Sequence, residues 1–270
     1  NAARVLEWLE EWHQTEWPEL KVYCTSVTEQ WANITICGPY ARDLLAEFTD
    51  DIDVSREAFP FMTMREGHVA GITARVFRVS FTGELSYEIN VPASFGLSLW
   101  TAFMNAGEKF GITPFGTETM HILRAEKGYI IAGQETDGTV TPADVGMAWA
   151  LSKKKDFLGR RSLARADAQR EDRKQLVGLL PLDQTAVLPE GGQITEVKGV
   201  TLPVSQPVPM IGHVTSSYHS ATMDCAFALA LIKGGRARLG DTVYIPTADR
   251  TLAATVTSPV SRTLAVMHTS

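Results

Sequence analysis

Residues 78–91 read RVSFTGELSYEINV, and this stretch decides how the rest of the sequence is interpreted. The Thr82-Gly83-Glu84 triplet marks a turn, and the residues after it alternate strictly between apolar and polar side chains. Because successive side chains of a β-strand point to opposite faces of the sheet, the pattern predicts a strand with one buried face. The apolar face carries Leu85, Tyr87, Ile89 and Val91, and the polar face carries Ser86, Glu88 and Asn90.

Glu88 is the residue of this strand that is best suited to bind a ligand. An ionised carboxylate only accepts hydrogen bonds, and it can take two parallel bonds from a ligand with two adjacent N–H donors. Pterins and guanines present such an edge. A solvated surface charge is the plainer interpretation, and the strand pattern alone leaves both interpretations open.

Around this strand the sequence alternates predicted strands and helices, which is typical of an α+β fold with a ferredoxin-like split βαβ unit. An amphipathic helix is predicted to begin at Asn1, and its apolar pattern is already under way at Val5. The chain does not begin with an initiator Met. We interpret this start either as a processed terminus or as a cut within a domain of a larger polypeptide. A hairpin is predicted over 21–28 and 31–37, helices over 40–48, 94–110 and 117–127, and strands over 61–64 and 74–80.

The second half of the chain differs in charge and composition. Residues 1–150 hold 10 Lys and Arg against 21 Asp and Glu, whereas residues 151–270 hold 15 against 10. The later part is rich in Pro, Gly and β-branched residues and predicts a small all-β barrel. We therefore expect two domains, 1–170 and 171–270. Its predicted strands are 175–180, 212–215, 226–232, 242–245 and 252–257.

Composition excludes several functional classes. A net charge of −6 over 270 residues argues against a general nucleic-acid binder, which needs a basic face. The longest apolar run, 225–232, is too short to span a membrane, so we expect a cytoplasmic protein without a membrane partner. Three cysteines without a CxxC pair predict neither a disulfide framework nor a metal site. Dinucleotide-binding, Walker, HExxH and GxSxG motifs are missing from the sequence.

Five motifs nevertheless occur in an order that is similar to the glycine-cleavage aminomethyltransferase family, whose members are folate-binding T-proteins. Each motif alone is weak, but five in order with compatible spacing make a strong resemblance that covers the whole chain. The motifs are SFTGELSYE (80–88), LRAEKGY (123–129), TPADVGMAW (141–149), KDFLG (155–159) and IGHVTS (211–216).

The resemblance implies an aminomethyltransferase-like folate-binding domain, incomplete at its N-terminus, followed by the β-barrel. It implies that Glu88 clamps the pterin of tetrahydrofolate and that Phe81, where relatives often have tyrosine, forms a wall of the pocket. Arg124 and Glu126 lie two residues apart on a predicted helix, so we expect them on different faces and at least one in a structural role. The cofactor-binding residues that match the family are Glu84, Glu88, Arg124, Glu126 and Tyr129, with Phe81 beside them.

Within the family, the phrases GTETMH (116–121) and LRAEKGY (123–129) resemble the C-terminal part of sarcosine oxidase α subunits, relatives of the dimethylglycine oxidases. Met120 stands where true aminomethyltransferases tend to have a folate-contacting arginine. The resemblance implies that the full complex demethylates sarcosine to glycine and forms 5,10-methylenetetrahydrofolate, with FAD or FMN and NAD in other regions or subunits. Its partners are then the other oxidase subunits and the upstream part of the same subunit. The family's catalytic aspartate has no match in this chain, so we expect no catalytic residue here and an inactive chain on its own.

Other interpretations remain open. The chain is a non-catalytic interaction scaffold of the oxidase if the altered residues 81 and 120 abolish folate binding, or it is a glycine-cleavage aminomethyltransferase. The iron–sulfur assembly branch, with a KGCYxGQ signature, fits less well because residues 127–134 read KGYIIAGQ. The basic strip 153–173 either attracts the glutamate tail of folate or is a solvated linker.

Overall fold

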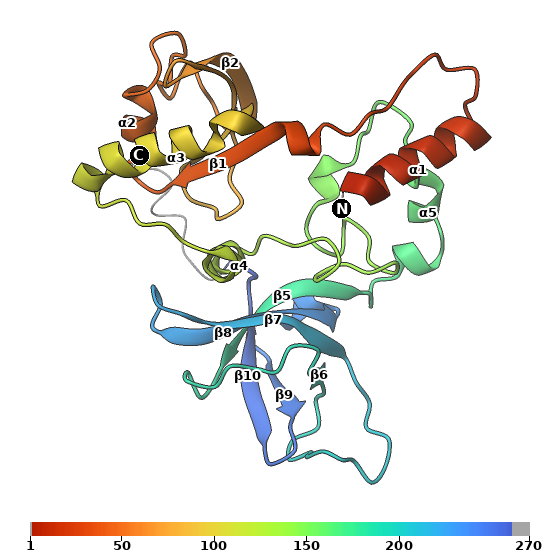
Figure 1. The fold of residues 1–270 in the computed structure, drawn as a ribbon. Coiled ribbons are helices and arrows are strands. Elements are labelled where there is room, and N and C mark those ends of the chain that lie inside the picture. The colour runs from red at the N-terminus through yellow and green to blue at the C-terminus, as the bar shows by residue number, and fades with distance from the viewer. Residues whose placement is uncertain (1, 261–270) are drawn as a thin grey trace. The chain divides into compact units, whose positions relative to one another are not determined.

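The computed structural model describes residues 2–260 (Figure 1). Their contacts divide the chain into two compact units. The first unit contains residues 2–80 and 84–114, and the second contains residues 81–83 and 115–260. Residue 170, where we expect a domain boundary, lies within the second unit of this division.

The first unit is built on a four-stranded antiparallel sheet with the order β1-β4-β3-β2. The predicted strand 31–37 is confirmed, but its predicted hairpin partner 21–28 is wrong, because those residues contain no strand. Instead β1 pairs with β4, and Thr35 lies opposite Glu88. The strands are β1 (Trp31–Cys37), β2 (Thr63–Val69), β3 (Ile72–Arg78) and β4 (Ser86–Pro92).

The core of this unit lies on the apolar face of the sheet, where α2 (Ala41–Ala46) and α3 (Gly96–Gly107) contribute Leu45 and Leu99. The predicted alternation is confirmed, since Tyr87, Ile89 and Val91 are all 0% exposed. Burying one such side chain stabilises the fold by roughly 1.5–3 kcal/mol. This face therefore fixes the register of β4, and with it the face on which Glu88 lies.

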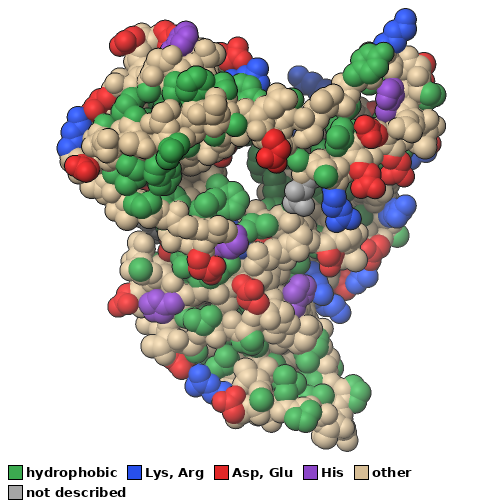
Figure 2. Space-filling model, in the orientation of Figure 1, with side chains coloured by type: hydrophobic (Ala, Val, Ile, Leu, Met, Phe, Trp, Pro, Cys, Tyr) green, Lys and Arg blue, Asp and Glu red, His purple; other side chains and the backbone are tan. Residues whose placement is uncertain are grey.

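An N-terminal helix, α1 (Ala2–Thr15), forms where the amphipathic pattern predicts it. None of its residues is buried. The ring of Trp12 stacks on that of Trp17 at 5.7 Å and meets that of Trp8 edge-on at 6.5 Å. Figure 2 shows hydrophobic side chains at several places on the surface, and Trp8 is one of the large hydrophobic residues that remain exposed.

The second unit contains a six-stranded antiparallel sheet with the order β6-β7-β8-β5-β10-β9. Two backbone hydrogen bonds of 2.9 Å join Thr195, next to β6, to Tyr244 in β9, so a bridge links the two edges of the sheet. Each predicted strand of this part is found. The strands are β5 (Lys174–Pro181), β6 (Gln193–Ile194), β7 (Gly212–Ser220), β8 (Cys225–Lys233), β9 (Thr242–Pro246) and β10 (Thr251–Thr257).

Strand β8 is buried on both faces and lies between two hydrophobic clusters. Ala228, Ala230 and Ile232 belong to the cluster formed by the six-stranded sheet and its loops. The alternate residues Phe227, Leu229 and Leu231 pack with Ala125 of α4 (Thr117–Glu126) and with Val145. Residues between 122 and 147 thus share a core with the sheet. The remaining helical segments are α5 (Arg160–Leu163) and short 3₁₀ turns at Thr28–Gln30, Ala93–Phe95, Glu108–Phe110, Ala148–Ala150, Asp167–Gln169 and Gly235–Arg238.

Candidate functional site

Glu88 lies in the middle of β4, on the polar face of the first unit's sheet. Its neighbours across the sheet are Thr35 on β1 and Phe77 on β3. The side chain is half-buried, and the amide of Asn33 donates to its Oε2 at 3.5 Å. Since a carboxylate offers about four lone-pair sites, Glu88 keeps most of its acceptor capacity for a ligand.

A chain of side-chain amides and hydroxyls continues from Glu88 across the same face. Asn33 Nδ2 donates to Asn90 Oδ1 at 3.1 Å, and Thr35 Oγ1 donates to Asn33 Oδ1 at 3.3 Å. These bonds orient Asn33 so that its NH₂ group faces the acceptors on β4. We call this set, Asn33, Thr35, Glu88 and Asn90, the Glu88 face.

The remaining predicted site residues fall on both units. Glu84 belongs to the first unit and is half-buried. Phe81 belongs to the second unit and is 37% exposed, and Tyr129 is 36% exposed. Both rings are therefore accessible, as a wall of a binding site requires.

Gly83 fixes the turn that follows Phe81. It has φ +77°, and a Cβ built on it would lie only 2.1 Å from Cγ of Lys127. The turn thus packs directly on the stem of Lys127, at a distance that only glycine permits. Lys127 itself is 4% exposed, and its Nζ has no hydrogen-bond partner.

Arg124 is fully buried in the second unit and is engaged by protein groups. Its Nη1 lies 2.9 Å from Oε2 of Glu135, and both side chains are 0% exposed. The same guanidinium donates to Ser216 Oγ at 2.7 Å and to the carbonyl of Tyr129 at 3.0 Å. Arg124 therefore ties α4 to β7 and fixes the backbone from which the Tyr129 ring projects.

Glu126 is 1% exposed and accepts a hydrogen bond of 2.6 Å from Ser220 Oγ. Ser216 and Ser220 are both on β7, so Arg124 and Glu126 reach the same strand. Both side chains thus reach β7, although their spacing of two residues predicts that they leave different faces of the helix. Their contact with a ligand stays a prediction.

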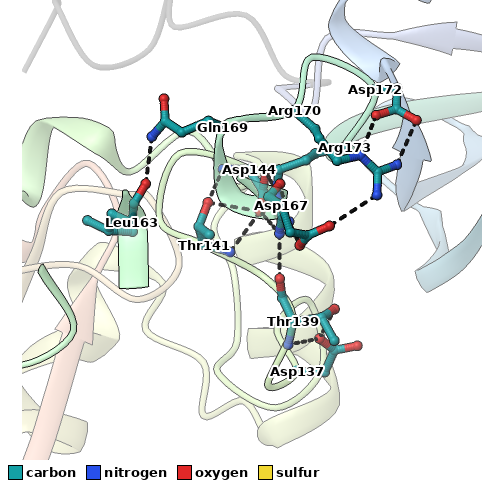
Figure 3. A network of polar contacts seen from close by, with 10 residues as sticks. All are labelled: Asp137, Thr139, Thr141, Asp144, Leu163, Asp167, Gln169, Arg170, Asp172 and Arg173. Carbon is teal, nitrogen blue, oxygen red and sulfur yellow. Dashed lines mark hydrogen bonds and ion pairs between the residues drawn. The ribbon is translucent and has the colours of Figure 1, made fainter. Parts of the chain in front are cut away.

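A second polar network joins the end of the basic strip 153–173 to residues 137–144 and is shown in Figure 3. Arg173 donates to Asp144 at 2.7 Å and to Asp167 at 2.6 Å. Arg170 pairs with Asp172 at 2.7 Å and with Asp167 at 3.0 Å. Three carboxylates thus neutralise these two arginines of the strip.

Asp144 is the buried member of this network. Burial by itself raises its pKa, but hydrogen bonds from Arg173 and Thr141 outweigh burial, so the pKa lies below the ordinary value. Thr141 donates to Asp144 through its backbone N–H at 2.7 Å. The TPAD sequence therefore forms a turn that presents its aspartate to Arg173. A cavity of about 280 Å³ lies beside this network, lined among others by Lys174, His213 and Lys233.

Within residues 2–260, no group of three or more His, Cys, Asp or Glu side chains is arranged to hold a metal ion. Over the same range, no helix combines the length and the hydropathy needed to cross a membrane.

Two family profiles match the chain. The profile described as the GCVT N-terminal domain matches residues 1–155, and the glycine cleavage T-protein C-terminal barrel domain matches residues 174–261. The expected fold class, an α+β T-protein domain followed by a barrel domain, is thereby confirmed.

Curated relatives extend well beyond the matched region. Sarcosine oxidase subunit alpha of Corynebacterium sp. strain P-1 is 53% identical over 252 residues, which are 91% of this chain and 25% of that protein. An aminomethyltransferase of Clostridium botulinum strain Okra is 32% identical over 83% of this chain and 57% of its own length. Mouse mitochondrial dimethylglycine dehydrogenase is 27% identical over 86% of this chain and 25% of its own length. The chain thus spans about a quarter of the oxidase subunits that it matches.

The fold is also found in a solved structure. Glycine cleavage system aminomethyltransferase T from Bartonella henselae superposes with a TM-score of 0.76 at 21% sequence identity. The match covers 97% of this chain and 66% of that protein.

Proposed function

The chain belongs to the glycine cleavage T-protein family, and from this premise we propose that it is the tetrahydrofolate-binding, one-carbon-accepting part of a sarcosine oxidase α subunit. The observation that carries the proposal is the geometry of Glu88. A half-buried carboxylate stands on a rigid central strand with one long protein hydrogen bond, so its oxygens are available to adjacent N–H donors. The aminopyrimidinone edge of a pterin presents that pair of donors.

The fit of tetrahydrofolate rests on the donor set of the Glu88 face. Glu88 supplies the acceptors, while Asn33 and Asn90 supply amide groups beside it. Phe77, directly opposite Glu88 on β3, supplies an apolar surface for a flat ring. When bound, tetrahydrofolate supplies the nitrogen that accepts the one-carbon unit.

In this proposal the residues of the chain bind and orient tetrahydrofolate, and none of them is assigned the proton transfer. Glu88 fixes the in-plane orientation of the pterin, because two parallel hydrogen bonds define one direction. Phe81 and Tyr129 are exposed aromatic residues of the second unit, and their contact with folate rests on the family resemblance alone. Flavin and nicotinamide chemistry belong to other regions or subunits, and glycine and the one-carbon adduct of folate are the products of the full complex.

Replacing Glu88 with alanine in the intact complex tests this function. Two hydrogen bonds to a charged group, each worth about 1.5 kcal/mol or more, disappear, so the affinity for tetrahydrofolate falls about 100-fold. Calorimetric titration measures the loss, and sarcosine-dependent flavin reduction serves as the readout that is retained. The matched control is Glu66→Ala, because Glu66 is a 61% exposed glutamate on the same sheet.

The scaffold hypothesis predicts the opposite result. If the chain only holds oxidase subunits together, Glu88→Ala and Glu66→Ala leave the folate affinity and stoichiometry of the complex equally unchanged. That result would contradict the proposed function.

A further inference from the structure

Two lysines face each other across strands β5 and β8 of the second unit. Lys174 and Lys233 are directly opposite in the antiparallel register, so their side chains leave the same face of the sheet. Like charges in this arrangement destabilise a sheet. Within residues 2–260, neither ammonium group forms an ion pair that would offset the repulsion. The pair therefore calls for a physical explanation.

Both lysines line one cavity of about 280 Å³, together with His213 of β7. His213 lies opposite Leu231 of β8, and Leu231 precedes Lys233 by two residues. Because side chains two residues apart on a strand share a face, His213 leaves the sheet on the same face as the two lysines. Leu231 also lines the cavity. A common face and a common cavity thus bring three nitrogen-bearing side chains around one space.

Four carboxylates also line the cavity, and each is bonded to another donor: Asp137, Asp144, Asp167 and Asp172. Asp172 accepts from Nε and Nη2 of Arg170 at 2.8 and 2.7 Å. Asp137 accepts from the backbone N–H and the hydroxyl of Thr139 at 2.7 and 2.6 Å. The other two are bonded to Arg173. These acceptors are therefore already in use, whereas no carboxylate of the described chain is within ion-pair distance of the two lysines.

His213 lies in the electric field of the lysines. Burial lowers the pKa of its imidazole, and the charge of Lys174 lowers it further, against the opposite influence of Asp137. The ring is therefore mostly neutral at pH 7, and a neutral imidazole still donates one N–H. An anion in the cavity would meet this donor as well as the two ammonium groups.

We propose that Lys174, Lys233 and His213 form a binding site for a small dianion, a phosphate group or a dicarboxylate. Each ammonium group has three N–H donors and no acceptor, so an oxyanion between the lysines replaces one repulsion with two attractions. The cavity suits a small ion, because pockets for drug-sized ligands have volumes of about 300–1,000 Å³. The site lies within the second unit and Glu88 lies in the first, so this proposal does not depend on the proposed function.

The test titrates the full chain with inorganic phosphate and, separately, with succinate, each compared with chloride at equal ionic strength. The variants are Lys174→Gln and Lys233→Gln, which remove one charge each at exposed positions, where substitutions usually change stability little. Lys198→Gln is the matched control, because Lys198 is an exposed lysine of the same unit outside the cavity. Calorimetry gives the affinity. The ring-proton signal of His213, assigned with His213→Gln, reports whether the anion reaches the cavity.

The expected result is saturable binding of phosphate or succinate to the unchanged protein and to Lys198→Gln, with a shift of the His213 signal. Lys174→Gln and Lys233→Gln then bind about tenfold more weakly or worse, since each has lost a charged donor. The bound anion also raises the Tm. Phosphate stabilises folded proteins in general by exclusion from their surface, so only the rise that Lys198→Gln keeps and Lys174→Gln loses is attributed to the site.

The two anions identify the source of the ligand group. Saturation by phosphate alone indicates a phosphate-bearing ligand, saturation by succinate alone indicates a dicarboxylate, and saturation by both indicates a site for either. If neither anion binds more tightly than chloride, or if Lys174→Gln and Lys233→Gln bind as tightly as Lys198→Gln, the site does not exist. Binding without a shift of the His213 signal would also contradict the proposal, because the anion would then lie outside the cavity.

Discussion

At the scale of single residues, the molecule uses its carboxylates in two different ways. Glu135 and Glu126 are buried and bonded to protein groups, so they hold elements together. Glu88 is only half-buried and makes one long contact, so it can serve a ligand. The sequence distinguishes them only in part. Alternation places Glu88 on a polar face, but nothing local reveals that Arg124 meets Glu135 and a serine 92 residues away.

The burial of Arg124 predicts a large effect on stability. Arg124→Met leaves the carboxylate of Glu135 buried without its cationic partner, which lowers the free energy of unfolding by about 3–5 kcal/mol. Urea denaturation measures the change. Arg75→Met is the control, because the Arg75–Glu66 pair is 50% and 61% exposed, and exposed pairs contribute about 1 kcal/mol or less. Equal losses in the two variants would contradict a structural role for Arg124.

The lowered pKa of Asp144 predicts a dependence of stability on pH. A carboxylate whose pKa is lower in the folded state stabilises the fold fully above its unfolded pKa, near 3.8, and loses that contribution as the pH falls through the folded value. The stability of the protein should therefore drop below pH 3.8 partly through Asp144. Asp144→Asn removes this share of the drop, and Asp50→Asn at an exposed position is the control variant. Denaturation curves between pH 2 and 7 decide, and parallel profiles for both variants would overturn the assignment.

At the scale of elements, local patterns predict strands well but their partners poorly. Residues 85–91 alternate, and β4 forms there because one face of the sheet is buried. Residues 21–28 are rich in β-forming side chains, yet they contain no strand, and β1 pairs instead with β4, far along the chain. Strand β6 has only two residues, which is too short for a periodic signal. Pairing that depends on contacts distant in sequence is not encoded in a short pattern.

The turn between β3 and β4 leaves no room for a methyl group at Gly83. The comparison is Gly71→Ala in the turn between β2 and β3. With φ +74° and no atom within 4 Å of the added Cβ, it costs only the left-handed backbone, about 1–2 kcal/mol. Gly83→Ala, at φ +77°, also drives a Cβ into Lys127, which adds about 1–3 kcal/mol. Thermal or chemical denaturation of both variants separates the two contributions. Equal costs would show that the turn does not pack on Lys127.

At the scale of the whole molecule, chemistry is distributed over two units. The Glu88 face belongs to the first unit, whereas Arg124, Glu126 and Tyr129 belong to the second unit. We expect a boundary at residue 170 because the composition changes near it. Ala125 and Val145 share a core with β5 and β8, and composition alone carries no information on such contacts. Family resemblance predicts the fold class correctly from ordered motifs. The resemblance does not predict the polar networks inside the second unit, because these networks join residues that are far apart in the sequence.

The central claim, that Glu88 binds the N–H edge of a pterin, is tested most directly by a cycle of two proteins and two ligands. Calorimetry compares tetrahydrofolate with an analogue that lacks the 2-amino group, in the unchanged complex and in Glu88→Ala. If Glu88 accepts from that amino group, the unchanged complex binds the analogue about tenfold or more weakly, and the difference nearly vanishes in Glu88→Ala. An equal difference between the two ligands in both proteins would show that Glu88 does not contact the pterin edge.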